Sequence, residues 1–342
     1  MISIIICSKN THLDEALENN IQATIGTNYE IIHIDNSQRT YNIFQAYNLG
    51  ITRAKGDNLC FMHEDIIFHS NDWGKIVEFY LAQPLVGAMG VAGGYAVTED
   101  LDWRFHNLND MFLCQDYTSV EAEPQRYCMY RPTSEPHAPL RPVVLLDGVW
   151  MCMRRELFNT IRFDEDNFHD FHLYDSDICM QINQTGLGIF VTHDILLEHL
   201  SEGSFSQSFV DSYNVFVEKW HKHLPLFCGR YIEPKELEQS LRQGHQLLEK
   251  RLKEDQHAAE LRRLLQMKQQ GLPCRDFTQE ELAFLDESAY RFRRFCIKDK
   301  RIPTDKVREV VKSYCALPYA RRKTALKLKY FWYRLVKGTF SH

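Results

Sequence analysis

A short acidic cluster follows an apolar stretch near position 60. Phe61-Met62 closes a run of residues typical of a buried strand, and His63-Glu64-Asp65 comes next. Carboxylates at the end of such a strand can hold Mg²⁺ or Mn²⁺, which in turn neutralises a diphosphate. An acidic turn after a strand is also common without any metal, so the cluster alone leaves both interpretations open.

Two further acids, Asp175 and Asp177, stand at the start of an expected helix. Negative side chains are favoured there because they cap backbone amides and face the positive end of the helix dipole, which explains at least one of them. The pair also lies close to the acidic run 164–166. Because a carboxylate aimed into a cleft can act as a general base on a hydroxyl group, both are candidate catalytic residues.

Two other segments carry side chains suited to a binding site. His199 follows a predicted strand and lies among acidic residues. A histidine there can complete a metal shell, although a lone histidine is more often structural. Asp147-Gly148 forms a turn directly before Trp150. The indole ring offers a stacking face for a sugar, and a position in the core is an equal alternative.

The elements that must position these residues alternate between strands and helices. Alternation at this spacing is typical of βαβ units and a mainly parallel sheet, in which ligands bind beyond the carboxyl ends of the strands. Five prolines between 123 and 142 predict an irregular loop. The expected strands are Ile2–Cys7, Tyr29–Ile34, Leu59–Met62, Val86–Val91, Val143–Leu146 and Gly188–Thr192, and the expected helices are Leu13–Ile25, Tyr41–Ala54, Arg155–Ile161 and Tyr174–Thr185.

The charge balance changes after position 232. Residues 1–232 carry 31 Asp and Glu against 15 Lys and Arg, whereas residues 233–342 carry 15 against 25. The change predicts an α/β domain over 1–232 and a helical, basic region over 233–342. Within the second region, 236–270 has the pattern of one long amphipathic helix. We expect it to pack on the domain, with self-association into a homodimer as the less favoured alternative.

The segment Ala320–Lys337 interleaves basic residues with aromatic and aliphatic ones, and no acid follows Glu309. An anionic membrane surface attracts such a helix, although the pattern also fits a helix whose aromatic face packs on protein. Nucleic-acid binding is disfavoured because the rest of the chain is strongly acidic. Ten cysteines lie scattered without a C-x-x-C pair. They predict reduced thiols and a cytoplasmic location, on the inner face of the cell membrane if 320–337 binds it.

The order and spacing of these motifs resemble family 2 glycosyltransferases with the GT-A fold. More narrowly, they resemble the bacterial subgroup similar to streptomycin-biosynthesis glycosyltransferase-like proteins, over about residues 1–225. The resemblance implies a Rossmann-like, mainly parallel sheet flanked by helices, with a C-terminal helical extension. It is carried by Ser3–Asn10, Ile34-Asp35-Asn36-Ser37, Ala46–Gly50, Ala54–Asp57, Phe61–Ile66, Leu146-Asp147-Gly148, Tyr174–Met180 and His199.

The resemblance also implies a role for each matching residue. Asp175 falls at the position of the catalytic base, with Asp177 as the competing assignment. Asp65 falls at the contact to metal and diphosphate, and His199 in the region that supplies a further metal ligand. The residues implied to border the acceptor are Asp147 and Trp150, and those implied to line the donor site are Ser8, Asp35, Asn48, Lys55, Asp57, His63 and Glu64.

Two departures from the family pattern bear on the chemistry. His63 stands where the D-x-D motif has its first aspartate, which leaves the metal preference and the need for a metal open. Gln181 replaces an arginine or lysine often found later in the same helix. The cofactors implied are a divalent cation, Mn²⁺ or Mg²⁺, and a nucleotide-sugar donor, with a UDP-sugar favoured over GDP- and dTDP-sugars.

Together these features predict a metal-dependent, inverting glycosyltransferase of polysaccharide biosynthesis. It would move a sugar to a hydroxyl group of a surface-glycan or lipid-linked acceptor, and inversion follows from the resemblance, with one base and no nucleophile. A non-catalytic glycosyltransferase-like module that binds a nucleotide or glycan as a scaffold is the alternative, motivated by His63 and Gln181. A nucleotidyltransferase ranks below both because no Gly-rich, basic phosphate loop lies near the N-terminus.

Overall fold

The computed structural model describes residues 1–105, 108–118, 124–130, 140–201, 205–228, 235, 237–250 and 252–253. The chain divides into two compact units, and the first contains Met1–Leu113, Met129–His199 and Gly203–Gln256. Every candidate site residue lies in this first unit. The predicted domain boundary between 232 and 233 stays a prediction.

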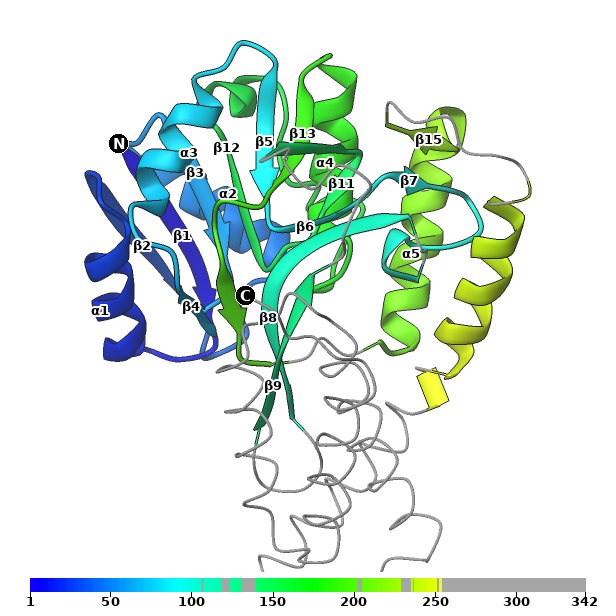
Figure 1. The fold of residues 1–342 in the computed structure, drawn as a ribbon, viewed down its shortest axis with the longest axis horizontal. Coiled ribbons are helices and arrows are strands. Elements are labelled where there is room, and N and C mark those ends of the chain that lie inside the picture. Colours follow the sequence, from blue (N-terminus) through cyan, green and yellow to red (C-terminus); the bar gives the residue numbers. More distant parts are fainter. Residues whose placement is uncertain are drawn as a thin grey trace, which may run out of the picture. The chain divides into compact units, whose positions relative to one another are not determined.

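A seven-stranded sheet forms the centre of the first unit (Figure 1). Its strand order is β10-β13-β5-β12-β3-β1-β2. β1 is parallel to β2 and β3, and β13 is parallel to β5, whereas β12 runs antiparallel between β3 and β5. The strands are β1 (Ile2–Ser8), β2 (Tyr29–Asp35), β3 (Asn58–Met62), β5 (Val86–Gly90), β10 (Leu140–Val143), β12 (Trp150–Arg154) and β13 (Gly188–Thr192). The predicted α/β class with a mainly parallel sheet is confirmed.

Helices flank this sheet. Three of them match the helices predicted over 13–25, 41–54 and 174–185 to within two residues at each end, whereas the helices Trp73–Leu81 and Gln207–Trp220 were not predicted. The helices are α1 (Glu15–Thr24), α2 (Ile43–Arg53), α3 (Trp73–Leu81), α4 (Tyr174–Gln184) and α5 (Gln207–Trp220), with 3-10 turns η1 (Trp103–Phe105), η2 (Arg155–Asn159) and η3 (His221–His223). α2 begins with a capping box, in which Asn42 and Gln45 each accept a hydrogen bond from the backbone amide of the other. This local signal fixes the start of the helix that covers β1 and β2.

Two smaller sheets complete the described fold. The larger has the order β11-β6-β8-β14-β4, with β9 paired to β8, and the smaller pairs β15 with β7. Their strands are β4 (Ile66–Phe68), β6 (Ala92–Gly94), β7 (Ala96–Val97), β8 (Asn109–Thr118), β9 (Pro124–Tyr130), β11 (Leu145–Leu146), β14 (Leu197–His199) and β15 (Leu226–Phe227). β14 matters for the site, because its antiparallel pairing with β4 carries a histidine back to the edge of the main sheet.

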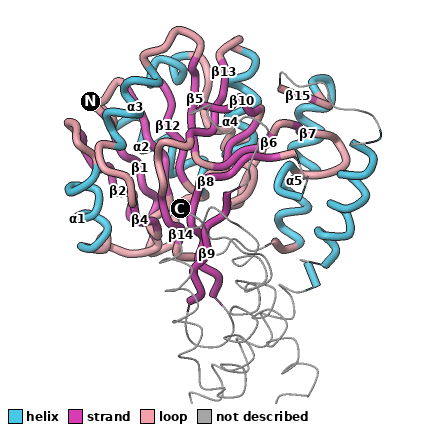
Figure 2. The backbone as a smooth tube through the Cα atoms, in the orientation of Figure 1, coloured by secondary structure: helices cyan, strands magenta, loops and turns pink. Residues whose placement is uncertain are grey.

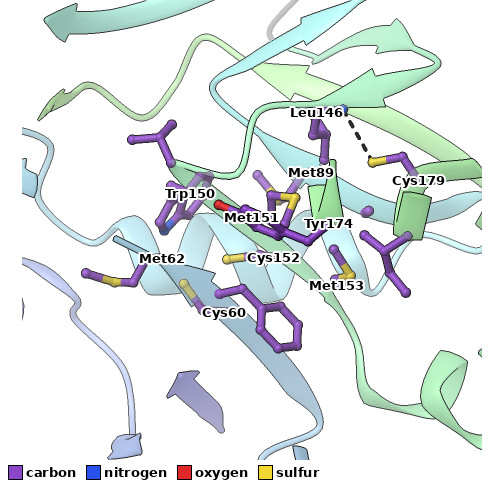
Figure 3. Close-up of a cluster of buried hydrophobic side chains, with 14 of the residues drawn as sticks. Cys60, Met62, Met89, Leu146, Trp150, Met151, Cys152, Met153, Tyr174 and Cys179 are labelled. Atoms are coloured by element: carbon purple, nitrogen blue, oxygen red, sulfur yellow. Dashed lines mark hydrogen bonds between the residues drawn. The ribbon is translucent and has the colours of Figure 1, made fainter. Parts of the chain in front are cut away.

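The core beside the site is rich in sulfur (Figure 3). Cys60 and Cys152 lie opposite each other on β3 and β12, and Cys179 Sγ accepts a hydrogen bond from the Leu146 amide at 3.3 Å. Burial raises the pKa of Cys152 and of Cys179, so both thiols stay protonated and unreactive. The cysteines described as free thiols are Cys7, Cys60, Cys152, Cys179 and Cys228, as the predicted reduced state requires.

The structure corrects three expectations about the middle of the chain. The prediction of an irregular loop at 123–142 is wrong at both ends, since β9 and β10 lie there, and residues 131–139 are outside the described ranges. Pro142 is tolerated because β10 is an edge strand. The strand expected at 143–146 is split between two sheets, and the helix expected at 155–161 is the shorter 3-10 turn η2.

The structure describes only the start of the predicted helical region over 233–342. Residues 237–250 are helical, in agreement with the start of the amphipathic pattern (Figure 2). Most of 236–270 beyond that point, and all of 320–337, lie outside the described residues. Within the described residues, no helix has both the length and the apolar character needed to cross a membrane.

Candidate active site

Three side chains from separate segments converge beyond the carboxyl end of β3. His63 and Asp65 follow that strand, and His199 ends β14, where it lies opposite Ile66 of β4. One ligand atom from each side chain lies within 4.8 Å of the other two. His199 Nε2 is 3.2 Å from His63 Nδ1 and 3.4 Å from Asp65 Oδ1. Two imidazoles and a carboxylate form a donor set that suits a divalent cation, so these residues fit the metal that the resemblance implies.

His63 is held in the neutral form that a metal requires. Burial and the neighbouring His199 lower the pKa of His63 to about 4. Its second ring nitrogen, Nε2, lies 3.0 Å from Tyr174 Oη at the start of α4. When Nε2 carries the proton and donates it to this hydroxyl group, Nδ1 keeps its lone pair toward Asp65 and His199. A hydrogen bond on the far nitrogen commonly orients metal-binding histidines in this way.

Gly148 makes room for this hydroxyl group. A Cβ atom at position 148 would stand 2.0 Å from Tyr174 Oη, so any other residue would push the phenol away from His63. The Gly148 amide in turn donates to Asp175 Oδ2 at 2.8 Å. The turn before β12 therefore contacts both Tyr174, which holds His63, and the candidate base Asp175.

Asp175 is a buried carboxylate in the first turn of α4. Only 3% of its surface is exposed. Oδ2 accepts hydrogen bonds from the Gly148 amide and the Arg104 guanidinium, and Oδ1 accepts one from the Ser176 amide at 2.7 Å. Burial raises the pKa of Asp175, and Arg104 opposes that rise. A carboxylate with a raised pKa beside a candidate metal site is suited to general-base chemistry.

Asp147 connects the carboxylate network to the histidines. Its Oδ1 accepts a hydrogen bond from the Val149 amide at 3.0 Å, and its Oδ2 accepts one from Arg104 Nε at 3.2 Å. Burial opposes ionisation of Asp147, but Arg104, the Val149 amide and the two histidines His63 and His199 together lower its pKa. Asp147 is therefore an anion at neutral pH, and its side chain is 30% exposed. That combination suits contact with a polar substrate.

Asp177 has a different environment, although it lies only two residues from Asp175. Its side chain is fully buried. Oδ1 accepts hydrogen bonds from Lys219 Nζ at 2.7 Å and Trp220 Nε1 at 2.8 Å, and Oδ2 accepts one from Gln181 Nε2 at 2.8 Å. This set of partners joins the start of α4 to the end of α5.

A second group of predicted residues lies at the carboxyl ends of β1 and β2. Ser8 and Asp35 are register partners there, one on each strand. Ser8 Oγ donates to Glu64 Oε2, and Asn10 Nδ2 donates to the same oxygen at 3.1 Å. Asp35 is exposed, and hydrogen bonds from Ser37 lower its pKa. The structure thus brings Ser8, Asp35 and Glu64 to the same edge of the sheet as the histidine cluster.

Four of the predicted site residues lie elsewhere. Asn48 is used by the scaffold, since its amide bridges the backbone N–H and C=O of Phe163. Lys55 and Asp57 precede β3 and lie beside the start of β1, at the opposite edge of the sheet, where Asp57 faces the Met1 amino group. These three residues are not brought to the site by the structure.

Trp150 is the fourth of these residues. It is fully buried and belongs to the cluster of buried side chains in Figure 3. Its ring packs edge-on against Trp73 with centroids 6.1 Å apart and against Phe68 with centroids 6.3 Å apart. A ring enclosed in this way has no face open for sugar stacking. The core position considered in the sequence analysis describes Trp150 correctly.

Comparison with known families adds an independent finding. Residues 3–214 match the model of a family described as glycosyltransferase like family. The chain belongs to this glycosyltransferase-like family. The matched residues include the histidine cluster, Asp147 and Asp175, so the site described above lies wholly inside the family region. No curated protein matches the sequence significantly.

Solved structures with a similar chain path include other glycosyltransferases. GalNAc-T7 with UDP, GalNAc and Mn²⁺ has 12% identity and a TM-score of 0.40, covering 64% of this chain and 48% of that chain. The mannosyltransferase PcManGT from Pyrobaculum calidifontis with GDP-Man and Mn²⁺ has 14% identity and a TM-score of 0.39, covering 97% and 87%. The catalytic domain of Drosophila β1,4-galactosyltransferase 7 with xylobiose has 12% identity and a TM-score of 0.35, covering 69% and 78%. The chain thus spans about half the length of GalNAc-T7, and the assignment to the family depends on the family match.

Two groups in this glycosyltransferase-like protein are missing from the sequence-based candidates. The Tyr174 hydroxyl group contacts a metal-site histidine, yet tyrosine at a helix start carries no pattern that indicates this. Arg104 contacts three carboxylates. One signal for it exists in the sequence, since it is an isolated base in a stretch that contains Glu99, Asp100 and Asp102.

Proposed function

We propose that this protein is an inverting glycosyltransferase that moves a sugar from a nucleotide-diphosphate donor to an acceptor hydroxyl group. Membership of the glycosyltransferase-like family supports the reaction class. The single observation that carries the proposal is the placement of a His63–Asp65–His199 cluster and the buried carboxylate of Asp175 at one edge of the sheet. Membership of the streptomycin-biosynthesis subgroup remains part of the proposal.

In the proposed mechanism, Asp175 is the general base. Its carboxylate takes the proton from the acceptor hydroxyl group while the acceptor oxygen forms a bond to the anomeric carbon. The bond from that carbon to the diphosphate breaks, and the diphosphate leaves with the electron pair. His63, Asp65 and His199 would hold the divalent cation, which supplies charge neutralisation for the leaving group when bound. Ser8, Asp35 and Glu64 would contact the nucleoside part of the donor, with a UDP-sugar favoured over GDP- and dTDP-sugars.

Thermal melting with UDP, GDP, dTDP and CDP, each with and without Mn²⁺ or Mg²⁺, tests the donor site. We expect one nucleotide to raise the melting temperature only in the presence of metal, and Asp65→Ala to abolish the effect. A ligand at 100 times its dissociation constant stabilises the fold by about 2.7 kcal/mol, equivalent to about 5 °C or more for a unit of this size. A panel in which no nucleotide shifts the midpoint would contradict the proposed donor site.

The donor set at the metal site predicts a preference among cations in the same experiment. Imidazole nitrogens favour transition metals, whereas Mg²⁺ prefers oxygen ligands, so Mn²⁺ should stabilise the protein more than Mg²⁺ at equal concentration. His63→Asp should reduce that difference, because it replaces a nitrogen ligand with oxygen. His169→Asp is the matched control, because His169 is exposed and is not a member of the cluster. Equal responses to both cations in the wild-type protein would contradict the prediction.

The acceptor is proposed to be a surface-glycan or lipid-linked precursor, handled on the cytoplasmic face of the cell membrane. The basic, aromatic segment 320–337 motivates this part. We expect a chain that lacks residues 319–342 to bind vesicles containing anionic lipid less tightly than the full chain does. The measurement is co-sedimentation with such vesicles, and an unchanged bound fraction would remove the membrane contact from the proposal. A homodimer formed through 236–270 likewise remains a prediction.

One observation favours a second candidate function, a non-catalytic module that binds a nucleotide or glycan and scaffolds an assembly. The Asp175 side chain is only 4% exposed and is already paired with Arg104, so it has little open surface for a substrate. The two candidates differ in whether the protein turns over a sugar nucleotide, and the first experiment of the Discussion distinguishes them.

A further inference from the structure

Arg104 occupies an unusual position among the charged side chains of the first unit. It lies in η1, and its guanidinium contacts carboxylates from three different segments. Nη1 donates to both oxygens of Asp102 at 3.1 and 3.2 Å, Nε donates to Asp147 at 3.2 Å, and Nη2 donates to Asp175 Oδ2. The guanidinium carbon also lies 4.8 Å from the centre of the Trp103 ring. The plane of the side chain is therefore fixed by contacts on all its nitrogen atoms and on one face.

Without this arginine, the charged groups of the cluster around Asp175 would all be negative. Asp102 and Asp175 are both almost fully buried, and Asp147 is the third anion in contact with the same guanidinium. A buried carboxylate surrounded by like charges tends to take up a proton. One arginine against three acids leaves the cluster negative even when Arg104 is present.

The remaining titratable groups that face Asp175 carry no positive charge to offset the negative charge of the cluster. They are the phenols of Tyr47 on α2 and Tyr174 on α4, and the thiol of Cys179 one turn further along α4. Burial raises the pKa of each of these groups, so all three are uncharged at neutral pH. Within the described residues, the electrostatic contacts of Asp175 thus include one cation, Arg104, and two anions, Asp102 and Asp147.

The contact with Arg104 also orients the carboxylate of Asp175. Arg104 and the Gly148 amide both donate to Oδ2 of Asp175, whereas Oδ1 accepts one hydrogen bond, from the amide of the following residue Ser176. Since each carboxylate oxygen has two lone pairs, Oδ1 retains the capacity to accept a proton. The guanidinium therefore constrains which oxygen can receive it.

We propose that Arg104 is a positioning residue that keeps Asp175 as an anion and presents Oδ1, rather than Oδ2, to the acceptor hydroxyl group. This inference rests on the proposed function, in which Asp175 is the base. In the transfer step the hydroxyl proton moves to Oδ1 and Asp175 becomes neutral. Arg104 then still pairs with Asp102 and Asp147, so the cluster loses one of its excess negative charges and no buried cation is left unpaired.

The test measures the protonation of Asp175 directly and needs no substrate. The full chain carrying ¹³C-labelled aspartate carboxyl groups is titrated by NMR, and the Asp175 signal is assigned by its loss in Asp175→Asn. In Arg104→Met, we expect Asp175 to titrate at a pH higher by about 1 to 3 units, the effect of losing an opposite charge at hydrogen-bonding distance. Arg104→Lys, which keeps the charge but not the planar fork, should give a smaller shift.

Arg162→Met is the matched control, because Arg162 is an exposed arginine paired with Asp166 outside this cluster. It should leave the Asp175 titration unchanged. If Arg104→Met does not fold, it is combined with Asp102→Asn, which removes one buried acid with the cation, and the double variant is compared with Asp102→Asn alone. An Asp175 titration that does not change on loss of Arg104, against the wild-type protein or against Asp102→Asn, would overturn the inference.

The pH dependence of transfer gives the second readout. In Arg104→Met the acid limb of the rate profile should move to higher pH by the same amount as the titration, with activity recovering as the pH rises, which a merely structural role would not produce. The melting-temperature response to Mn²⁺ should persist, because the carboxylates that Arg104 hydrogen-bonds belong to Asp102, Asp147 and Asp175 and not to the metal cluster. If the Asp175 titration shifts but the protein transfers no sugar, the proposed function is refuted and the role of Arg104 in keeping Asp175 ionised is not. If the protein transfers sugar but the titration does not shift, only that role of Arg104 is refuted.

Discussion

Replacing Asp175 with asparagine is expected to lower the rate of sugar transfer by about 10²- to 10⁴-fold, the usual contribution of a general base. Asparagine has nearly the same shape, but its amide cannot take the proton of the acceptor hydroxyl group. The measurement is turnover of the sugar nucleotide that the melting experiment identifies, with and without acceptor. Nucleotide binding should persist, because the hydrogen bonds of Asp175 come from Arg104, Gly148 and Ser176, which belong neither to the histidine cluster nor to the ends of β1 and β2.

The variant should also remain folded, which follows from the direction of the pKa shift. Burial raises the pKa of Asp175 in the folded protein above its value in the unfolded chain. Such a group contributes stability below the unfolded pKa, and that contribution is lost as the pH rises through the folded pKa. At neutral pH the ionised side chain therefore does not favour folding, and its neutral replacement should melt close to the wild-type temperature. For the same reason, wild-type activity should fall as the pH drops through the raised pKa.

Asp166→Asn is the control for this experiment, because Asp166 is an exposed acid paired with Arg162. Its turnover should equal that of the wild-type protein. Full turnover by Asp175→Asn would exclude Asp175 as the base. A wild-type protein that binds a nucleotide with metal, yet turns over no sugar nucleotide at all, would favour the scaffold over the enzyme.

The strands and helices of the first half could be predicted because local patterns and tertiary packing agree there. β1 contains four isoleucines among its seven residues and is buried on both faces, and its register partner β2 ends at Asp35, where polar residues stop the strand. The prediction of a loop at 123–142 was wrong because the local pattern and the tertiary packing disagree there. Its prolines indicate a loop, but an edge strand accepts a proline whose missing N–H would face away from the sheet, and β10 uses this at Pro142.

The metal cluster could be predicted from the sequence because His63 and Asp65 follow β3, and His199 stands at the end of β14. Strand ends of a parallel sheet meet at one edge, and β14 adds His199 to it through its antiparallel pairing with β4. The same rule excludes Lys55 and Asp57, which precede β3 and so lie at the other edge. The family resemblance placed these two in the donor site, and the strand polarity gives the physical reason why they do not lie there.

The choice between the two acids of α4 could not be made from the sequence. Asp175 and Asp177 share the first turn, and both are favoured by the helix dipole. They differ in the cation that pairs with each, which comes from 42 positions later in the chain for Asp177 and from 71 positions earlier for Asp175. Contacts at such separations are set by the fold, and no local pattern around position 176 encodes them.

Asp177→Ala should consequently affect stability far more than catalysis. The substitution leaves Lys219 and the Trp220 indole N–H at the end of α5 without the carboxylate that joins them to α4. Lys219 keeps its contact with Asp164, but the buried Trp220 N–H loses its acceptor. Leaving a buried donor unsatisfied costs about 1–3 kcal/mol, which lowers the melting temperature of a unit of this size by about 2 °C or more. The measurement is thermal or urea unfolding of the full chain, compared with Asp164→Ala. That control removes the other carboxylate bound by Lys219 and should cost less, because Asp164 is partly exposed and Asp177 is not.

A double variant separates the ion pair from the rest of the packing. Lys219→Met alone leaves Asp177 buried without its cation, whereas Asp177→Ala with Lys219→Met removes both charges. The double variant should therefore lose less stability than the sum of the two single variants, with a coupling of about 0.5–3 kcal/mol. Additive losses would show that Asp177 and Lys219 do not act as a pair. If Asp177→Ala instead melted like the wild-type protein and lost turnover, while Asp175→Asn kept it, the two acids would exchange roles and α4 would present its base two residues later.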